Sequence, residues 1–319
     1  MSTSGTYNYT LTRNDIIRLA LQGINAIELT DAAIPQEQQE HAEKVLNLMI
    51  KEWEADYIGI WKTQSATLFL QYGTRNYELG PTGTHCTKSY TQTNIATAAI
   101  SGASSIIVDS ASGLTIADYI GVELDDNTLQ WFTISGIAGT TITLSGTLTD
   151  SVAVDNIVYA YTTKIQRPLY ILDDVTKQYI NNNDIEIPLT RMTRVGYNRI
   201  PYKTQISEPF QFYYDKQMTN GVLYIYPVPG DVTKVINFSF KEPLQSFDAA
   251  ANTPDFPDEW GNPLVTCLKA KLGSLPSYAV PADIQALLNN EAAMALDKMR
   301  QFDLEGTGMN LKYPYFRNW

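Results

Sequence analysis

The sequence predicts an α+β fold in which a discontinuous helical bundle, built from N- and C-terminal helices, accompanies an antiparallel β domain with an inserted small β-barrel or sandwich module. Three observations predict this class. Apolar residues recur with helical spacing near both ends of the chain, they alternate with a period of two in its middle, and a stretch rich in Thr, Ser, Ala and Gly interrupts the alternating part. The length of 319 residues suffices for one large domain or several smaller ones.

Two helices are predicted in residues 1–60. Thr12 is suited to cap the first helix, and Asp15 follows three residues later as its partner in a capping box. Pro35 suits the first position of the second helix. One face of that helix is rich in Gln and Glu, and the opposite face is apolar, comprising Ala42, Val45, Leu46, Met49, Ile50 and Trp53.

The β domain is predicted in two parts, residues 61–83 and residues 164–253. The first part indicates two strands around a turn at Gly73, and the second contains long strands that carry Tyr and Phe. Between them, residues 84–163 predict an inserted module of short antiparallel strands, in the segments SSIIVDS, YIGVEL, LQWFTIS, TTITLSG and NIVYAY.

Residues 254–306 predict two further helices, the first ending near Gly273 and the second around Gly306. An amphipathic helix cannot bury its apolar stripe alone. We therefore expect the N-terminal and C-terminal pairs to pack on each other, so that the two ends of the chain meet in one domain. Residues 307–319 then form a C-terminal extension.

Composition narrows the classes of function. The formal net charge of −11 and the pI of about 4.7 argue against a protein that grips nucleic acid over a broad basic face. The two cysteines are far apart in sequence, which argues against a disulfide framework or a zinc site and favours a reducing compartment. The sequence shows neither a secretory signal nor an apolar run long enough to span a membrane, so neither is expected.

Histidine offers little catalytic potential. Only His41 and His85 are present, and we expect His41 to lie solvated on the Gln- and Glu-rich face of its helix. His85 and Cys86 are neighbours that could in principle hold a metal, but the sequence gives them no further ligands. No phosphate-binding, dinucleotide-binding or nucleophile motif occurs, so we expect no catalytic residue, no cofactor and no metal.

Acidic clusters beside tryptophan are the best remaining indication of an enzyme, because paired carboxylates can hydrolyse a glycosidic bond. A hairpin turn explains the first cluster better, and a helix N-terminus, which favours acids, explains the second. We therefore expect a protein that is not an enzyme. The clusters are Glu123, Asp125 and Asp126 before Trp131, and Asp255, Asp258 and Glu259 beside Trp260.

The segment RMTRVGYNRIPYK is locally basic in an acidic protein. Its cations are Arg191, Arg194, Arg199 and Lys203, with no acid among them. Two interpretations stay open: a solvated face, or a contact for an acidic partner or for DNA phosphate.

The chain ends in NLKYPYFRNW, which places four aromatic residues in the last seven positions without helical or strand spacing. Such a segment can bind a pocket on another molecule, and repetition around a symmetric ring would strengthen a weak single contact. The alternative is that it folds back onto its own helices.

Several segments together resemble the head-to-tail adaptor proteins of short-tailed bacteriophages, also called head-completion, packaged-DNA-stabilisation or tail-tube A-type proteins. The resemblance covers nearly everything except the Thr- and Ser-rich insert, which is itself similar to small β modules that decorate phage structural proteins. The segments are IIRLALQGINAI with AEKVLNLMIKEW, then ATLFLQYGTRNYELGP, then RPLYI with IEIPLTRMTRVGYNRIPYKTQISEPFQFYYDKQMTNGVLYIYPVPG, and finally DFPDEWGNPLVTCLKAKLG.

This resemblance implies a virion structural protein, made in the host bacterial cytoplasm and located at the capsid–tail junction. It implies a homo-oligomeric ring of about twelve copies beneath the portal ring, with tail nozzle or tail fibre proteins attached below. The ring would close the filled head and extend the DNA ejection channel. It also implies a C-terminal extension that reaches the portal, through Leu311, Tyr313, Pro314, Tyr315, Phe316 and Trp319.

The acidity fits a ring through which DNA passes without specific binding, because a negative lumen repels phosphate. Two other functions stay open. The chain could be a tail-associated polysaccharide or peptidoglycan hydrolase that uses Glu123 or Glu259. It could also be a receptor-binding or glycan-binding tail component, in which Trp131 and neighbouring Tyr side chains stack on sugars.

Overall fold

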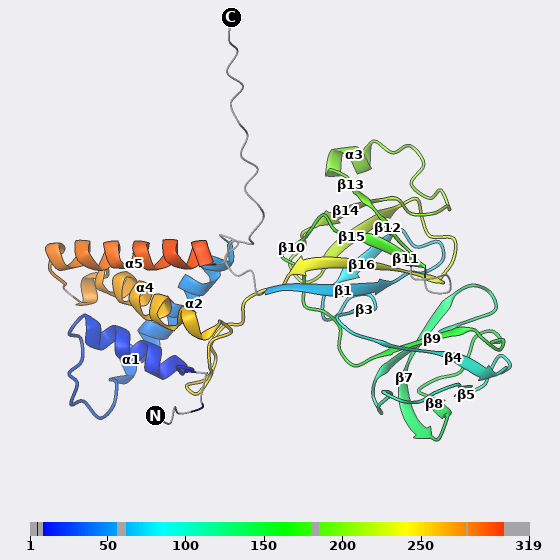
Figure 1. The fold of residues 1–319 in the computed structure, drawn as a ribbon, viewed down its shortest axis with the longest axis horizontal. Coiled ribbons are helices and arrows are strands. Elements are labelled where there is room, and N and C mark those ends of the chain that lie inside the picture. The colour runs from blue at the N-terminus through cyan, green and yellow to red at the C-terminus, as the bar shows by residue number, and fades with distance from the viewer. Residues whose placement is uncertain (1–4, 6–8, 56–61, 180–184, 279, 303–319) are drawn as a thin grey trace, which may run out of the picture. The chain divides into compact units, whose positions relative to one another are not determined.

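A computed structural model describes residue 5 and residues 9–55, 62–179, 185–278 and 280–302. The chain divides into two compact units (Figure 1). The helical unit combines both ends of the chain, Met1–Lys62 and Leu244–Trp319, and the β unit is the continuous segment Thr63–Pro243. The C-terminal extension of residues 307–319 lies outside the described residues.

The helical unit has one core to which helices from both ends of the chain contribute. Its helices are α1 (Arg13–Gly23), α2 (Gln36–Ala55), α4 (Gly261–Gly273) and α5 (Ala282–Phe302), with short 3-10 turns η2 (Asp258–Trp260) and η3 (Pro276–Tyr278). Helix α4 contacts α1, α2 and α5 (Figure 1). The fully buried side chains of this core are Ile16, Ile17, Ala20, Leu21, Ala42, Leu46, Met49, Ile50, Trp260, Leu264, Leu268 and Leu272.

Local signals define the start of α1 as the sequence predicts. Thr12 accepts a hydrogen bond from the backbone N–H of Asp15, and the Asp15 carboxylate accepts one from the backbone N–H of Thr12. The capping box is therefore confirmed. The hydrogen bonds from Thr12 lower the pKa of Asp15. Arg13 is buried and pairs with Glu43 at 2.6 Å, which joins α1 to α2.

The chain re-enters the helical unit earlier than the sequence indicates. We expected the β domain to continue to residue 253, whereas the unit boundary falls between Pro243 and Leu244. The reason is burial: Leu244 and Phe247 belong to the helical core. Asn47 of α2 also donates to the Phe247 carbonyl and accepts from its N–H.

Outside the barrel, the described residues of the β unit form two sheets. The first sheet has the order β12-β11-β16-β1-β3, and β10 also pairs with β16. The second has the order β13-β14-β15-β2, in which β13 runs parallel to β14 and the other pairs are antiparallel. The strands are β1 (Thr63–Phe69), β2 (Asn76–Leu79), β3 (Cys86–Thr87), β10 (Tyr170–Ile171), β11 (Thr176–Tyr179), β12 (Glu186–Pro188), β13 (Thr190–Arg191), β14 (Gln211–Asp215), β15 (Gly221–Tyr226) and β16 (Lys234–Lys241).

The two sheets share one core because alternate residues of their strands point to the same interior. In β14 and β15 the buried positions alternate with half-buried ones, and Phe212 lies opposite Ile225. In β1 and β16, Leu68 lies opposite Ile236. The alternation that predicts strands in this part of the chain is thus the alternation that builds the core.

The inserted module is a closed barrel in the order β4-β5-β8-β7-β6-β9. Its two ends lie together: the Thr87 hydroxyl donates to the Thr163 carbonyl at 2.9 Å, and the Ile165 N–H donates to the Cys86 carbonyl at 3.1 Å. The strands are β4 (Thr91–Thr97), β5 (Ser105–Val108), β6 (Tyr119–Glu123), β7 (Leu129–Ala138), β8 (Thr141–Leu144) and β9 (Ile157–Tyr161). The α+β class with a small β-barrel is therefore confirmed.

Candidate functional site

The six residues expected to reach the portal lie beyond α5 and outside the described residues. They are Leu311, Tyr313, Pro314, Tyr315, Phe316 and Trp319. The described residue nearest to them in sequence is Phe302, which ends α5 in the helical unit. The other predicted site, the basic segment, lies within the described residues of the β unit.

The basic segment spans β13, the short helix α3 (Arg194–Asn198) and the loop that follows. Arg191 is engaged within the chain: its guanidinium donates to the Asp173 carboxylate and the Ile171 carbonyl, and lies 5.3 Å from the centre of the Phe212 ring. The acid that the segment lacks in sequence is supplied by a distant residue in the fold. Arg191 therefore anchors β13, the edge strand of the second sheet, to residues 171 and 173.

The other three cations differ in what they contact. Arg194 is exposed and lies 3.5 Å from the Asp215 carboxylate. The Lys203 ammonium donates to the carbonyls of Asn198 and Ile200, which closes the turn after α3. Arg199 is exposed and forms no ion pair with any described residue. Arg194 and Arg199 thus present the guanidinium groups that an external anion could reach.

The loop after α3 is fixed to the first sheet by Glu208, an exposed residue that pairs with two buried lysines. Glu208 accepts from Lys177 at 2.6 Å and from Lys234 at 2.5 Å, and both lysines are buried. Burial alone would raise the pKa of Glu208, but the hydrogen bonds and charges of the two lysines outweigh it and lower the pKa. This network positions the loop that carries Lys203 and leads from Arg199.

Three tyrosines of α3, β14 and β15 pack on one another, a cluster that no sequence pattern indicates. The Tyr213 and Tyr224 rings stack across β14 and β15 with centroids 5.7 Å apart, and Tyr197 of α3 packs on Tyr224 at 4.8 Å. The Lys203 ammonium lies over the Tyr197 ring. We call this the basic-aromatic face, comprising Arg194, Arg199, Lys203, Tyr197, Tyr213 and Tyr224. Tyr197 is buried, so an anionic or planar group would contact the exposed Arg194 and Arg199 and the half-buried Tyr213 and Tyr224.

The acidic cluster near Trp131 stabilises the barrel. Glu123 accepts from the Ile157 N–H at 2.9 Å, and burial raises its pKa. Asp125 accepts from Ser151, Asn156 and the Ala153 N–H, and hydrogen bonding, foremost that from Ser151, lowers its pKa. Asp126 accepts from the N–H and hydroxyl of Thr128 in the hairpin turn between β6 and β7.

The second acidic cluster also has structural partners. Asp255 pairs with Lys62 at 2.5 Å, and Asp258 accepts from the Tyr9 N–H at 3.0 Å. Glu259 is exposed in the 3-10 turn before α4. Trp260 is fully buried in the helical core, so its ring face is not available to a sugar.

His41 corrects one expectation. We predicted a solvated residue, whereas His41 is half-buried and its Nδ1 lies 3.2 Å from the Tyr278 hydroxyl, with the two rings stacked. The cause is η3, a turn that the sequence pattern of α2 does not reveal. Among the described residues, no group of three or more His, Cys, Asp or Glu side chains could hold a metal ion.

His85 and Trp131 belong to an aromatic junction that joins the barrel to the first sheet. Their rings stack with centroids 3.9 Å apart and an interplanar angle of 2°, and the His85 Nδ1 lies 2.6 Å from the Tyr161 hydroxyl. Trp131 also packs on Phe69 of β1 at 5.1 Å. We define the aromatic junction as Phe69, His85, Tyr90, Tyr119, Trp131, Tyr159 and Tyr161.

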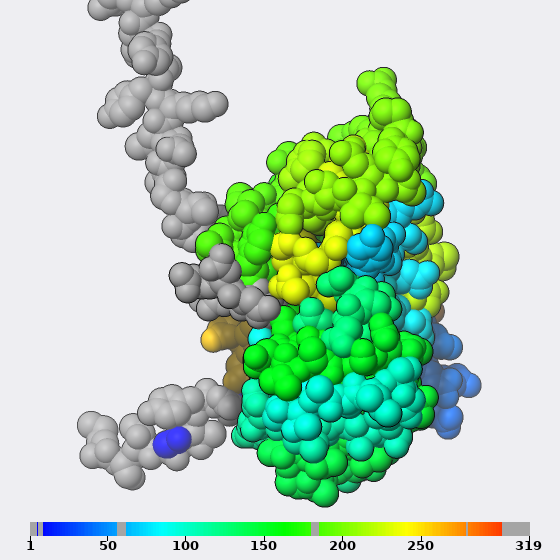
Figure 2. All heavy atoms as spheres, turned by 90° about the vertical axis from the view of Figure 1, so that its right-hand side faces the viewer, coloured from blue at the N-terminus to red at the C-terminus, as the bar shows by residue number. Residues whose placement is uncertain are grey.

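His85 covers one face of the Trp131 ring, so that face is not free to stack on a sugar as the glycan-binding alternative requires. In the space-filling view, barrel segments in cyan and green meet sheet segments in yellow and blue directly (Figure 2). The junction makes the barrel part of the β unit.

His85 should make the β unit sensitive to acid. Burial, with a smaller contribution from the Lys164 charge, lowers the pKa of His85 from 6.5 to about 3. Between these two pH values the unfolded chain binds a proton at His85 that the folded chain does not bind. The contribution of His85 to the free energy of unfolding is therefore fully present above about pH 6.5 and is lost as the pH falls. We expect His85→Phe, which keeps a ring on Trp131, to reduce the stability loss between pH 7 and pH 5 by about 1 kcal/mol, since partial exposure screens the effect.

The measurement is urea unfolding of the wild type and of His85→Phe at both pH values, followed by hydrogen exchange of peptides from β7 and β9. The two proteins have the same carboxylates, so the effect of these groups on the pH dependence of unfolding cancels when the two are compared. An equal pH dependence would show that His85 does not titrate in this way.

Comparisons with known proteins add no functional assignment. No family model matches the chain, and no curated protein matches it. Among solved structures, the chain is similar to the Gp54 tailspike of Acinetobacter baumannii bacteriophage AP22, solved in complex with A. baumannii capsular saccharide. The sequence identity is 18%, the match covers 24% of this chain and 15% of the tailspike chain, and the TM-score is 0.21. A likeness at this TM-score does not establish a shared fold. No helix in the described residues is long and apolar enough to cross a membrane.

Proposed function

We propose that this chain is a structural virion protein of a short-tailed bacteriophage, an adaptor that joins the portal vertex of the capsid to the tail. About twelve copies would form a ring that closes the filled head and extends the DNA ejection channel. The proposal starts from the sequence segments that resemble such adaptors. Those segments include α1, α2, α4, β1, β2, β14 and β15, so they come from both units of the chain.

The observation that carries the proposal is an apolar stripe on α5. Ile284, Leu287 and Met294 are 43%, 63% and 66% exposed, although Leu288 and Met299 of the same helix are buried in the core. Their spacing of three and seven residues places the exposed three on one flank of the helix. Large apolar side chains grouped on a surface helix are typical of a protein–protein interface. A ring of identical subunits supplies such a partner.

Partners follow from the same proposal. The C-terminal residues Leu311 to Trp319 would bind the portal, and tail nozzle or tail fibre proteins would attach on the opposite side of the ring. Arg194 and Arg199 of the basic-aromatic face would contact an acidic partner or DNA phosphate. The net charge of −11 would keep DNA from adhering as it passes through the lumen.

Measuring particle size with and without portal rings tests this function. We expect the full chain to co-sediment with portal rings and to form a complex of ring size. A chain that ends at Met309 should stay folded and lose this binding, because it lacks the aromatic residues. Portal binding that survives the truncation would remove the C-terminal residues from the proposal, and failure of the full chain to bind portal would overturn the adaptor function.

The α5 stripe gives a second, separable prediction. Leu287→Glu should weaken assembly of the ring on the portal by at least about tenfold, because it places a charge at an exposed leucine that the proposed interface would bury. Ala286→Glu places the same charge at an exposed position of the same helix outside the stripe and should leave assembly unchanged. Analytical ultracentrifugation of both variants with portal measures the difference. Equal assembly of the two variants would exclude the stripe as the interface.

A further inference from the structure

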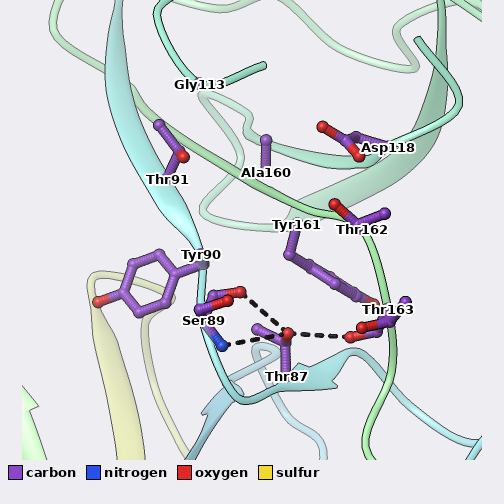
Figure 3. Close-up of a pocket in the computed structure, with 10 residues that line it drawn as sticks. All are labelled: Thr87, Ser89, Tyr90, Thr91, Gly113, Asp118, Ala160, Tyr161, Thr162 and Thr163. Carbon is purple, nitrogen blue, oxygen red and sulfur yellow. Dashed lines mark hydrogen bonds between the residues drawn. The ribbon is translucent and has the colours of Figure 1, made fainter. Parts of the chain in front are cut away.

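A polar pocket of about 320 Å³ lies at one end of the barrel, beside the two connections to the sheets (Figure 3). Strands β4 and β9 form one wall, the connecting residues 87–90 and 162–163 another, and the loop before β6 a third. Its volume lies near the lower end of the range of about 300 to 1,000 Å³ that is usual for small-molecule sites. The pocket is unrelated to the basic-aromatic face and to the α5 stripe.

Hydroxyl groups dominate the walls. The Thr87 hydroxyl is committed to the fold, since its one O–H is shared between the carbonyls of Ser89 and Thr163 and its oxygen accepts from the Ser89 N–H. Four other hydroxyl side chains line the pocket and form no hydrogen bond with the described part of the chain: Ser89, Thr91, Thr162 and Thr163. Gly113, at φ 82°, faces Thr91, and a Cβ there would approach the Thr91 hydroxyl to 3.1 Å. Glycine thus keeps this wall open.

Asp118 provides the second observation that points to a ligand. Asp118 is only 3% exposed, and its Oδ2 accepts a hydrogen bond from the Thr115 N–H at 2.8 Å. Its Oδ1 is buried and has no hydrogen-bond partner among the described residues. Figure 3 shows the carboxyl group turned toward the space beside Ala160, which the Thr91 and Thr162 side chains also face. A buried polar atom without a partner is costly unless something binds it.

The lining selects a class of ligand. Calcium usually takes about six to eight oxygen ligands including several carboxylates, and this pocket holds one carboxyl group. An anion would be repelled by Asp118, and an apolar molecule would leave the hydroxyl groups unsatisfied. A polyhydroxylated molecule can donate to the Asp118 carboxyl group and exchange hydrogen bonds with the threonines. We propose that this pocket binds a single ring of a neutral saccharide, held by Asp118, Thr91 and Thr162.

The test uses the full chain and saturation-transfer NMR with the methyl glycosides of glucose, galactose, mannose and N-acetylglucosamine. We expect transfer to at least one glycoside, with millimolar affinity because a single ring makes few contacts. Thr162→Val removes one exposed hydroxyl without changing shape and should lower the affinity by about threefold to tenfold. Asp118→Asn should lower it by at least about tenfold, because it removes a hydrogen bond to a charged group.

Thr140→Val is the matched control, since Thr140 is an exposed threonine in the β7–β8 turn and does not line the pocket. Its affinity should equal that of the wild type. Thr162→Val keeps the test decisive if Asp118→Asn weakens the turn at Thr115. Absence of transfer to all four glycosides, or equal affinities in Thr162→Val and Thr140→Val, would overturn the proposal.

Discussion

Replacing Phe69 with alanine is expected to lower the free energy of unfolding of the β unit by about 3 to 5 kcal/mol. Phe69 is 1% exposed and lies at the centre of the aromatic junction, with ring centroids 4.8 Å from Tyr159, 5.1 Å from Trp131 and 5.3 Å from Tyr90. Its removal would leave a cavity between β1 and the barrel and would remove these ring contacts together. Urea unfolding measures the loss of free energy, and hydrogen exchange shows in which strands it occurs.

Tyr72→Ala is the control, because Tyr72 is an aromatic residue of the same segment but is 48% exposed. Its cost should stay below about 1 kcal/mol. The location of the effect is as informative as its size. Since Phe69 packs on both sides of the junction, amide exchange should accelerate in the barrel strands β7 and β9 and also in β1 and β16. Acceleration confined to β1 and β16 would show that the barrel is stable without the junction.

The junction also determines what removal of the barrel should do to the rest of the β unit. Its ends are hydrogen-bonded through Thr87 and Thr163, so the chain could be closed at this point without moving β3 far. Closure alone would nevertheless expose Phe69, Val232 and Val235, which are buried with barrel residues in one cluster. The sequence predicts the proximity of the ends because the flanking strands need it. It does not predict the buried contact, because aromatic residues of the barrel give no sign of what they pack against.

Local signals explain what the sequence predicts well. The Thr12 and Asp15 pair marks the start of α1 because both hydrogen bonds form between residues three apart. The apolar alternation of β14 and β15 marks strands because it depends on the backbone period alone. The sequence does not indicate strand β4 (Thr91–Thr97), because its residues, TQTNIAT, are mostly polar and its place depends on pairing with β9 and β5.

The candidate sites depend on contacts between residues far apart in the chain. The basic segment has no acid of its own, yet Asp173 pairs with Arg191 and Asp215 with Arg194. The stacking of Tyr213 on Tyr224 requires the register of β14 and β15, which a turn of several residues does not specify. The sequence likewise does not show that the Asp118 Oδ1 has no partner among the described residues, because aspartate before a strand is ordinary in a turn.

Trp260→Ala is expected to lower the stability of the helical unit by about 3 to 5 kcal/mol. Trp260 is fully buried, and its ring centroid lies 5.5 Å from Trp53 of α2 and 5.7 Å from Phe256. Because α4 contacts α1, α2 and α5, the cavity should loosen helices from both ends of the chain. Hydrogen exchange should therefore accelerate in all four helices and stay unchanged in the barrel, whose core is separate. Acceleration confined to α4 and α5 would contradict a shared core.

Glu259→Ala, at the exposed neighbouring position, should change stability by less than about 0.5 kcal/mol. Comparing Trp260→Ala with Leu287→Glu also separates an effect on folding from an effect on assembly. Under conditions where Trp260→Ala remains mostly folded, its portal binding should fall only by the fraction that is unfolded, whereas Leu287→Glu should lose binding with its helices intact. A destabilised core and a damaged interface thus give different combinations of exchange and sedimentation, because α5 buries Leu288 inward while Leu287 is exposed.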